Sequence, residues 1–235
     1  MFEYRLCFTK LNNLKYLSHL NLMKTMERAI RRAGIPLAFS EGFHPHPKIS
    51  FGPALALGID SMAEYLDLEL VAAMEAGLIL DSLNRVLPDG LRISEAKRLG
   101  PGAKSLNALI NKAAYRVLLQ IEPDLKEAVK QQLSRLFQMT ELNIFRTGKE
   151  GQKTVNIRPW MHNLTIEEKS DTMLAVYLVG EIGNNGNLRP EEVLDRITLP
   201  LKVVALTRNG LWYEEKGLVK TPMDFGEQIG DMDHD

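Results

Sequence analysis

Residues 40–51, Ser-Glu-Gly-Phe-His-Pro-His-Pro-Lys-Ile-Ser-Phe, bring two imidazoles, an ammonium group, hydroxyls and phenyl rings into one short stretch. Pro45 and Pro47 exclude a helix, because each fixes its own φ, lacks an N–H donor and pushes the preceding residue towards extended geometry. The stretch is therefore predicted to be a stiff loop. Its side chains that suit a phosphate or a flat aromatic base are those of Ser40, Phe43, His46 and Lys48. The alternative is a stiffened strand connection whose phenyl rings fill a core.

A helix is predicted between Ser18, a suitable N-cap, and Gly34. At 100° per residue its apolar residues fall on one side, which is expected to pack on a sheet. The opposite side carries a basic stripe within a sector of roughly 100°, formed by Lys24, Arg28, Arg31 and Arg32. The stripe suits an anionic partner, although a solvated helix face has the same pattern.

Two histidines are candidates for a general base, His19 and His46. His19 falls in the first turn of the predicted helix and projects towards its apolar side, so a satisfied histidine at the core edge is the other interpretation. His44 and His46 are one residue apart, and on an extended backbone both point to the same side, as in some metal sites. No further ligand pattern accompanies them, so no metal site is predicted. Glycine-rich phosphate loops and a nucleophile elbow are also missing, so no cofactor is expected and no catalytic residue is assigned.

The second candidate site is the segment from Val155 to Trp160. On a strand, Asn156, Arg158 and Trp160 share one surface, which suits a nucleobase or phosphate through hydrogen bonding, charge pairing and stacking. A cross-strand salt bridge for Arg158 and core packing for Trp160 explain the same residues. Further positive charge on this predicted hairpin comes from Arg146 and Lys149.

The chain has 235 residues, 45% of them hydrophobic and 25% charged, with a formal net charge of -1, which is an ordinary globular composition. Residues 1–60 contain eight basic and four acidic residues, a net charge of +4, whereas residues 221–235 carry acidic residues and no lysine or arginine. An anionic partner is therefore expected at the N-terminal part. Cys7, the single cysteine, is expected to be a buried thiol. Without a leader or a membrane-spanning apolar run, the protein is expected to be cytoplasmic.

The apolar patterns give the same order of elements in both halves: strand, helix, strands, helix, strand. This order is typical of a ferredoxin-like unit, so the predicted fold class is α+β, with tandem ferredoxin-like units and antiparallel sheets. Gly100-Pro101-Gly102 marks the boundary between domains 1–102 and 103–210. The remaining residues, 211–235, are expected to form an acidic extension that is disordered at its end.

The element bounds behind this prediction follow from apolar spacing and from breakers. In the first half, strands are predicted at 3–9, 35–39, 64–70 and 91–99, and helices at 18–34 and 72–86. In the second half, strands are predicted at 115–121, 142–145, 153–159, 173–179 and 201–207, and helices begin near 123 and 189.

Three runs, Leu14–Leu20, Arg28–Leu37 and Ser40–Phe51, resemble the bacterial radical SAM-associated protein family, and Thr147-Gly148 and Val155–Pro159 resemble its second motif. The resemblance extends to about residue 208. It implies a partner, because family members occur beside, or fused to, the C-terminus of a radical SAM protein with a cobalamin-binding-type domain. The family's usual run has asparagine where this sequence has His44. That departure weakens a paired-histidine metal site and leaves His46 as the better functional candidate.

These features favour a non-catalytic module that binds RNA or presents a substrate, and that acts with a radical SAM enzyme. One alternative is an RNA-processing or RNA-modifying enzyme, with His19 or His46 as the base and Lys48 stabilising the phosphorane. Paired ferredoxin-like units with a helix histidine look like CRISPR repeat-processing endoribonucleases at the level of fold. The other alternative is a protein-interaction scaffold whose basic face docks on an acidic surface of its partner, without nucleic acid.

Overall fold

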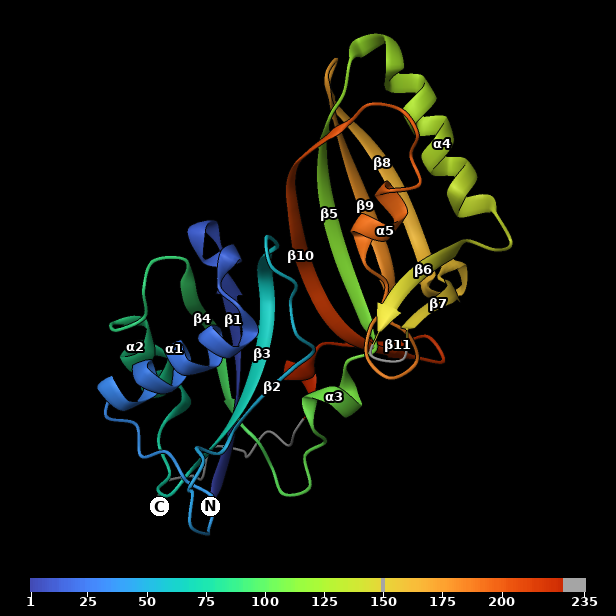
Figure 1. Cartoon of the computed structure of the whole chain (residues 1–235). Coiled ribbons are helices and arrows are strands. Elements are labelled where there is room, and N and C mark those ends of the chain that lie inside the picture. The colour runs from blue at the N-terminus through green and yellow to red at the C-terminus, as the bar shows by residue number, and fades with distance from the viewer. Residues whose placement is uncertain (149–150, 226–235) are drawn as a thin grey trace. The chain divides into compact units, whose positions relative to one another are not determined.

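The computed structural model describes residues 1–148 and 151–225, which form two compact units. The first unit contains residues 1–110 and the described residues from 210 onwards, and the second contains residues 111–209. Each unit is a mixed α/β structure built on antiparallel strands (Figure 1). The division therefore differs from the expected boundaries at 102 and 210. The connecting segment as far as Ile110 packs with the first unit, and so does the segment that follows Asn209.

The first unit is a sheet with two helices on one face. Its strands lie in the order β4-β1-β3, with β2 paired to β3, and these pairs are antiparallel. The core consists of inward-facing residues of β1, β3 and β4 packed against the apolar sides of α1 and α2. The bounds of these elements are β1 (Phe2–Lys10), α1 (His19–Arg32), β2 (Ile49–Phe51), β3 (Asp60–Leu70), α2 (Ala76–Asn84) and β4 (Leu91–Arg98), with short helices η1 (Asn12–Tyr16) and α3 (Leu106–Leu109).

Arg5 ties the C-terminal residues into this first unit. Its guanidinium is fully buried, pairs with both carboxylate oxygens of Asp67 at 2.7 and 2.8 Å, and donates to the carbonyl oxygens of Pro222 and Lys104 at 3.0 and 2.9 Å. The segment held in this way contains β11 (Leu218–Lys220), which pairs with the end of β10 (Lys202–Glu215), and the short helix η4 (Pro222–Asp224). Residues up to 225 are thus part of the fold. Disorder was expected for the last fifteen residues, 221–235. This expectation is wrong for 221–225, which contain η4, and residues 226–235 lie outside the described residues.

The second unit has a sheet in the strand order β10-β5-β9-β8, and a separate two-stranded sheet, β6-β7. Helix α4 lies against β8 of the larger sheet, and its buried residues are Val129, Leu133 and Leu136 (Figure 1). The bounds are β5 (Lys112–Gln120), α4 (Lys126–Gln138), β6 (Asn143–Gly148), β7 (Gly151–Asn156), β8 (Met161–Ser170), β9 (Met173–Glu181) and α5 (Pro190–Leu194), with short helices η2 (Pro123–Leu125) and η3 (Arg158–Trp160).

Two predicted strands, at 153–159 and 35–39, are wrong, and one observed strand was not predicted. The strand expected at 153–159 ends at Asn156, because Pro159 lacks an N–H donor and residues 158–160 form the helix η3 instead. Strand β8, which the sequence patterns did not predict, supplies the antiparallel neighbour of β9. In the first unit the strand expected at 35–39 is reduced to two isolated bridges, Leu37 with Leu70 and Phe39 with Pro47.

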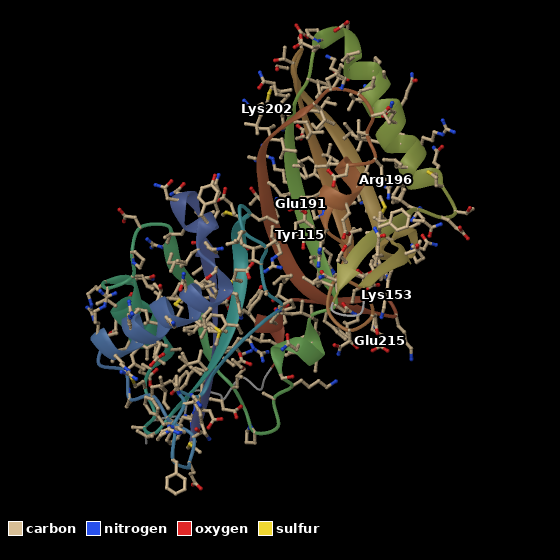
Figure 2. All side chains as sticks on the ribbon, in the orientation of Figure 1. Tyr115, Lys153, Glu191, Arg196, Lys202 and Glu215 are labelled. Carbon is tan, nitrogen blue, oxygen red and sulfur yellow. The ribbon has the colours of Figure 1, made fainter. Side chains whose placement is uncertain are left out.

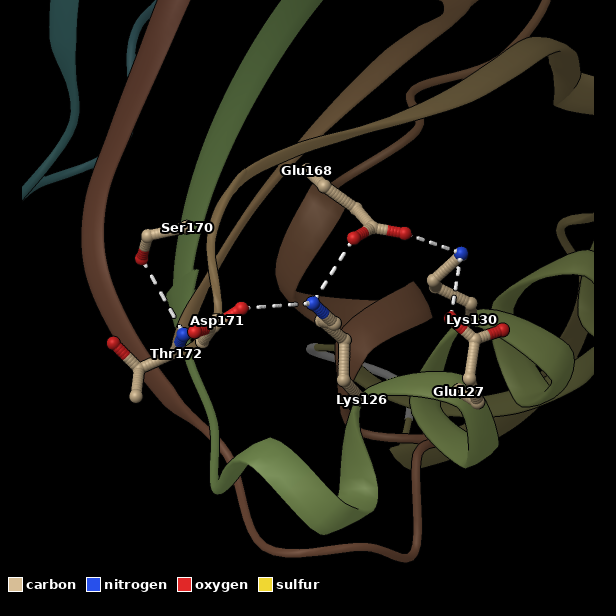
Figure 3. A network of polar contacts seen from close by, with 7 residues as sticks. All are labelled: Lys126, Glu127, Lys130, Glu168, Ser170, Asp171 and Thr172. Atoms are coloured by element: carbon tan, nitrogen blue, oxygen red, sulfur yellow. Dashed lines mark hydrogen bonds and ion pairs between the residues drawn. The ribbon is translucent and has the colours of Figure 1, made fainter.

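A network of ion pairs joins the start of α4 to the end of β8 (Figure 3). The carboxylate of Glu168 lies 2.6 Å from Lys130 Nζ and 3.0 Å from Lys126 Nζ. The turn into β9 is closed by the Thr172 backbone N–H, which donates to Ser170 Oγ at 3.3 Å. The hydrogen bonds from Lys130 and then from Lys126 lower the pKa of Glu168 to about 2.

None of the helices in the described ranges has the length and apolar character needed to cross a membrane.

Candidate functional site

Helix α1 positions the predicted basic stripe, and both of its ends are fixed by local contacts. Ser18 is its N-cap, as predicted, and its Oγ accepts a hydrogen bond from the Asn21 backbone N–H at 3.3 Å. At the other end the N–H of Ile35 donates to the carbonyl of Ile30, and the N–H of Gly34 donates to the carbonyl of Arg31. Gly34 has φ +67°, which favours glycine, so the sequence ends the helix at this residue.

All four predicted stripe residues are exposed along α1. Because Leu22, Met26, Ala29 and Ile30 are buried against the sheet, the opposite side of the helix exposes Lys24, Arg28 and Arg31. Arg31 pairs with Glu27 at 2.7 Å, and its guanidinium carbon lies 5.8 Å from the centroid of the Phe39 ring. Arg32 is exposed as well, and its Nη2 donates to the carbonyl of Val86, just after α2.

The predicted proline-rich loop is closed at its base by backbone and hydroxyl contacts. The N–H of Ser40 donates to the carbonyl of His46 at 2.8 Å, and Ser40 Oγ accepts from the N–H of His46 at 2.9 Å. Lys48 N donates to the carbonyl of Ala38 at 2.9 Å, which continues the same ladder. At the tip Gly42 has φ +115°, a conformation that an L side chain rarely adopts. The loop therefore has a defined shape held by few contacts to the core.

The loop's aromatic side chains divide between solvent and core. Phe43 is fully exposed, with a relative accessibility of 102%, and His44 and His46 are also exposed. Phe51 packs edge-on against Phe8 and His19, at ring centroid distances of 6.3 and 5.6 Å. The interpretation in which the phenyl rings fill a core holds for Phe51 and is wrong for Phe43.

The stripe and the loop meet on the first unit. Phe39, which lies beneath Arg31, forms a bridge with Pro47 at the base of the loop. We call this region the stripe–loop surface, and its residues are Lys24, Arg28, Arg31, Phe39, Phe43, His44 and His46. It presents the Arg31 cation beside the Phe39 ring, which is 40% exposed, and this combination is suited to a single-stranded nucleic acid.

The net charge of residues 1–60 overstates the positive charge that is exposed at this surface. Arg5 and Lys10 are buried, and Lys48 Nζ lies 2.7 Å from Glu69 Oε2. These cations balance carboxylates and carbonyls of the unit itself. The exposed positive charge of this stretch therefore lies mainly on α1, where Arg31 is likewise paired with Glu27.

His19 lines a small cavity of about 10 Å³, together with Lys10, Glu64 and Tyr65. A space of this size holds about one water molecule, so it excludes a ribose. The placement matches the interpretation of a histidine at the core edge, and it argues against His19 as the base for an RNA hydroxyl. His46, by contrast, is open to solvent.

Sequence reasoning missed the buried polar cluster beside His19. Lys10 Nζ donates to the carbonyl of Leu17 at 2.9 Å, and Ser61 Oγ donates to the buried carboxylate of Glu64 at 2.5 Å. A signal was present in the alternation of β1, because Lys10 follows Tyr4, Leu6 and Phe8 at a spacing of two and so shares their inward face.

The residues of the second motif do not share a surface. Asn156 Oδ1 accepts from the N–H groups of Leu142 and Arg158 at 2.9 and 3.1 Å, which fixes the end of the hairpin. The Arg158 guanidinium carbon lies 4.5 Å from the centroid of the Phe137 ring, and Nη1 donates to the carbonyl of Met161.

Trp160 is held by packing. The Arg146 guanidinium carbon lies 5.0 Å from the Trp160 ring centroid, and a Cβ at Gly186 would lie 2.5 Å from the indole nitrogen. The core-packing alternative thus describes Trp160 in this structure. Lys149, which was expected to add charge to this hairpin, lies outside the described residues.

The described residues contain no group of three or more histidine, cysteine or acidic side chains placed to hold a metal ion. Cys7 is a buried free thiol, as predicted, and burial raises its pKa. Burial likewise raises the pKa of the Tyr65 hydroxyl. Because both groups remain protonated at neutral pH, neither is suited to act as a nucleophile.

Comparisons with known proteins give a family and a fold. Residues 3–190 match the model of a family described as an uncharacterized protein conserved in bacteria (DUF2344). No curated protein matches the chain.

Among solved structures, a chain of a Cbf5-Nop10-Gar1 complex has a TM-score of 0.50 and 10% identity over 90% of this chain. This chain spans about half of that chain, 50% of its length, and the likeness concerns the fold alone. A heme-bound DypB variant from Rhodococcus jostii RHA1 covers 91% of this chain and 93% of its own, with 10% identity and a TM-score of 0.23. A second DypB structure from Rhodococcus jostii RHA1 has a TM-score of 0.22 and 8% identity, covering 91% of this chain and 92% of its own.

Proposed function

The chain belongs to this family of uncharacterized proteins conserved in bacteria, and we propose a function for it from the chemistry of its surface. We propose that it is a non-catalytic RNA-binding module that presents RNA to a separate radical SAM enzyme. The observation that carries the proposal is the stripe–loop surface. There Arg31, one of the exposed cations of α1, lies against Phe39 at the base of a closed loop whose Phe43 ring is fully exposed.

The chemistry of this surface fits single-stranded RNA better than a duplex. Lys24, Arg28 and Arg31 succeed one another at four and three residues along one side of α1, which suits successive phosphates. Phe43 offers a ring face on which a base stacks without regard to its identity. His44 and His46 flank it as ring-shaped hydrogen-bonding partners, and Ser40 maintains the loop that carries them.

The test is binding of a fluorescently labelled single-stranded RNA 20-mer, followed by anisotropy over a series of KCl concentrations. Removing two phosphate contacts with Arg28→Ala/Arg31→Ala is expected to lower the slope of log K against log salt by about 1.4, at about 0.7 per phosphate. Phe43→Ala is expected to weaken binding about tenfold with the slope unchanged, because stacking is not a charge contact.

A matched control removes the same charge elsewhere. Lys202 and Lys216 are exposed and lie outside the stripe–loop surface, so Lys202→Ala/Lys216→Ala is expected to leave affinity within about twofold. Equal losses in the two double variants would show a non-specific charge effect, and absence of binding at low salt would end the proposal. RNA cleavage that His46→Ala abolishes would favour the enzyme alternative instead.

The proposed partner is a radical SAM protein with a cobalamin-binding-type domain, in the cytoplasm, and it is supported by the sequence resemblance. A pull-down from native cytosol, with protein and RNA both sequenced, tests it. Arg31→Glu/Arg32→Glu separates the RNA-binding role from the scaffold alternative. If this variant loses the partner enzyme and no RNA accompanies the wild type, the protein is a scaffold.

We further propose that both units are ferredoxin-like, which the strand orders support. In the first unit the order β4-β1-β3-β2 follows a β1-α1-β2-β3-α2-β4 chain. In the second, β10-β5-β9-β8 is the same order when the β6-β7 hairpin is counted as an insertion after α4. An experimental structure of each unit would test this assignment.

A further inference from the structure

An open groove of about 300 Å³ lies between helix α4 and strand β8, entirely within the second unit. The helix contributes Lys130, Ser134, Phe137 and Gln138 to its lining, and the strand contributes Leu164 and Ile166. Lys130, Ser134 and Phe137 succeed one another at four and three residues, so they form one stripe on the flank of α4. The RNA-binding proposal, which concerns the first unit, assigns these residues no role.

Side-chain contacts fix both ends of the groove. At the start of α4, two lysines of the helix pair with Glu168 at the end of β8 (Figure 3). At the end of α4, the Arg158 guanidinium carbon lies 4.5 Å from the Phe137 ring centroid, and Arg158 Nη1 donates to the carbonyl of Met161 at the start of β8. Helix and strand are therefore held side by side before any ligand arrives, so binding between them requires little ordering.

The groove follows a free edge of the sheet. Strand β8 ends the order β10-β5-β9-β8, so in the described part of the chain it has a strand neighbour on one side only. Figure 2 shows Lys202 on β10, the strand at the opposite end of this order. Because no residue of β9 lines the groove, the groove opens on the free side of β8. Along that side every second residue directs its N–H and C=O away from β9.

The middle of this edge lacks most of the features that usually prevent strand addition. Such features are bulges, prolines, lysines and covering segments. The register of β8 with β9 shifts between Met161 and Asn163 and again between Glu168 and Ser170. From Asn163 to Glu168 the register is continuous, and this stretch contains no lysine or proline. An extended peptide can pair with these backbone groups and direct alternate side chains into the groove.

The charges beside the groove favour a peptide over a nucleic acid. Lys126, Lys130, Glu127, Glu168 and Asp171 form one cluster at the end of β8, and two lysines with three carboxylates give it a net charge of −1. The side chains of Glu127 and Asp171 are 67% and 95% exposed. These carboxylates repel a phosphate backbone and attract a lysine or arginine of a peptide.

We propose that β8 binds an extended segment of a partner protein by strand addition. The segment pairs with the backbone of residues 163–168, places an apolar side chain against Phe137 and Ile166, and carries a basic residue at the Glu168 end. In this mode of recognition the main-chain hydrogen bonds give affinity, and the groove selects alternate side chains.

The test starts with selection of seven-residue peptides from a random displayed library on the full chain, followed by anisotropy of the selected peptides made with a fluorescent label. The selected sequences are expected to alternate apolar residues and to include a basic one. Ser134→Trp fills the groove and is expected to weaken binding about tenfold. Lys202→Trp introduces the same side chain at an exposed position of β10 and should bind within about twofold of wild type. Ser134 is also exposed, so circular dichroism should show that both variants keep the fold.

Backbone methylation of the peptide separates strand addition from docking by side chains alone. Each selected peptide is made in two forms, N-methylated at odd or at even positions. One form should lose affinity about tenfold or more and the other should keep it, because alternate N–H groups of an added strand face β8.

Four results would overturn the proposal. The library yields no binding peptide, the peptides bind Ser134→Trp like wild type, or the two methylated forms behave alike. The fourth is sedimentation of the wild type as a dimer that Ser134→Trp dissociates, since the edge is then covered by a second copy of this chain. Arg28→Ala/Arg31→Ala should leave peptide affinity unchanged, so failure of the RNA-binding proposal is recognised independently.

Discussion

Two arginine–carboxylate pairs in the first unit have the same length and opposite surroundings, which allows a matched test of what burial does. Arg5 and Asp67 are 2.7 Å apart with side-chain exposures of 0% and 17%, and Arg31 and Glu27 are 2.7 Å apart with exposures of 61% and 29%. The perturbations are Asp67→Ala and Glu27→Ala.

The expected costs differ by roughly an order of magnitude. Asp67→Ala leaves the guanidinium of Arg5 buried, with the Pro222 and Lys104 carbonyls as its hydrogen-bond acceptors, and an uncompensated buried charge costs about 3–5 kcal/mol. Glu27→Ala removes an ion pair between residues one helical turn apart. Solvent screens this pair, so it contributes about 0.3–0.5 kcal/mol to stability. The difference arises from desolvation, since the distance is the same in both pairs.

The assay is urea unfolding by tryptophan fluorescence in a Trp160→Phe background. The chain has two tryptophans, and Trp212 belongs to the first unit, so its signal then reports that unit. Limited proteolysis should also release the segment after Gly210 from the Asp67→Ala variant, because Arg5 holds Pro222. If Asp67→Ala costs no more than Glu27→Ala, or the segment stays protected, the argument that Arg5 ties the C-terminal residues into the unit is wrong.

Two further predictions concern Gly186 and Glu168 in the second unit, and Gly77 in the first unit is the control for Gly186. Gly186→Ala should lower the free energy of unfolding by about 1–3 kcal/mol, because its Cβ would overlap the neighbouring indole. Gly77→Ala, in helix α2 with nothing within 4 Å, should raise it by up to about 1 kcal/mol, and both are read from urea midpoints. Because the folded pKa of Glu168 is depressed to about 2, its stabilisation is fully present above the ordinary carboxyl pKa and is lost as pH falls towards 2. Lys130→Met should raise that pKa in an NMR carboxyl titration, and an unchanged titration would contradict the assigned cause.

The sequence predicts the elements whose signals are local. Alternation identifies β1, and the spacing of apolar residues together with Ser18 and Gly34 identifies α1 and both of its ends. Each of these signals acts within one turn or one strand, so distant contacts do not change the outcome. Cys7 falls with Arg5 on the other face of β1, and it is buried because both faces of this strand are covered.

Features that are decided by contacts between residues distant in sequence cannot be predicted from local sequence patterns. Strand β8 escapes prediction because most of its side chains are exposed and charged residues fill its end, so it lacks the apolar alternation that marks a strand. Its partner β9 supplies the backbone hydrogen bonds and the burial. Summed charge fails for the same reason, since whether Arg5 balances Asp67 or meets solvent is decided by a contact across 62 residues.

The stripe–loop surface shows how the motif residues divide between folding and function. Ser40 and Lys48 have hydrogen-bonding or ionic partners within the unit, so packing and loop closure account for their presence. Packing and loop closure do not account for Phe43. Its loop is closed at the base and has a positive φ at Gly42, and the phenyl ring is fully exposed to water. Burying a phenyl ring contributes about 1.5–3 kcal/mol to stability, and the exposed Phe43 ring forgoes this contribution. A ligand that covers the ring would explain its exposure. The exposed cations of α1, of which Arg31 lies against Phe39 at the base of the same loop, favour an anionic, base-bearing ligand.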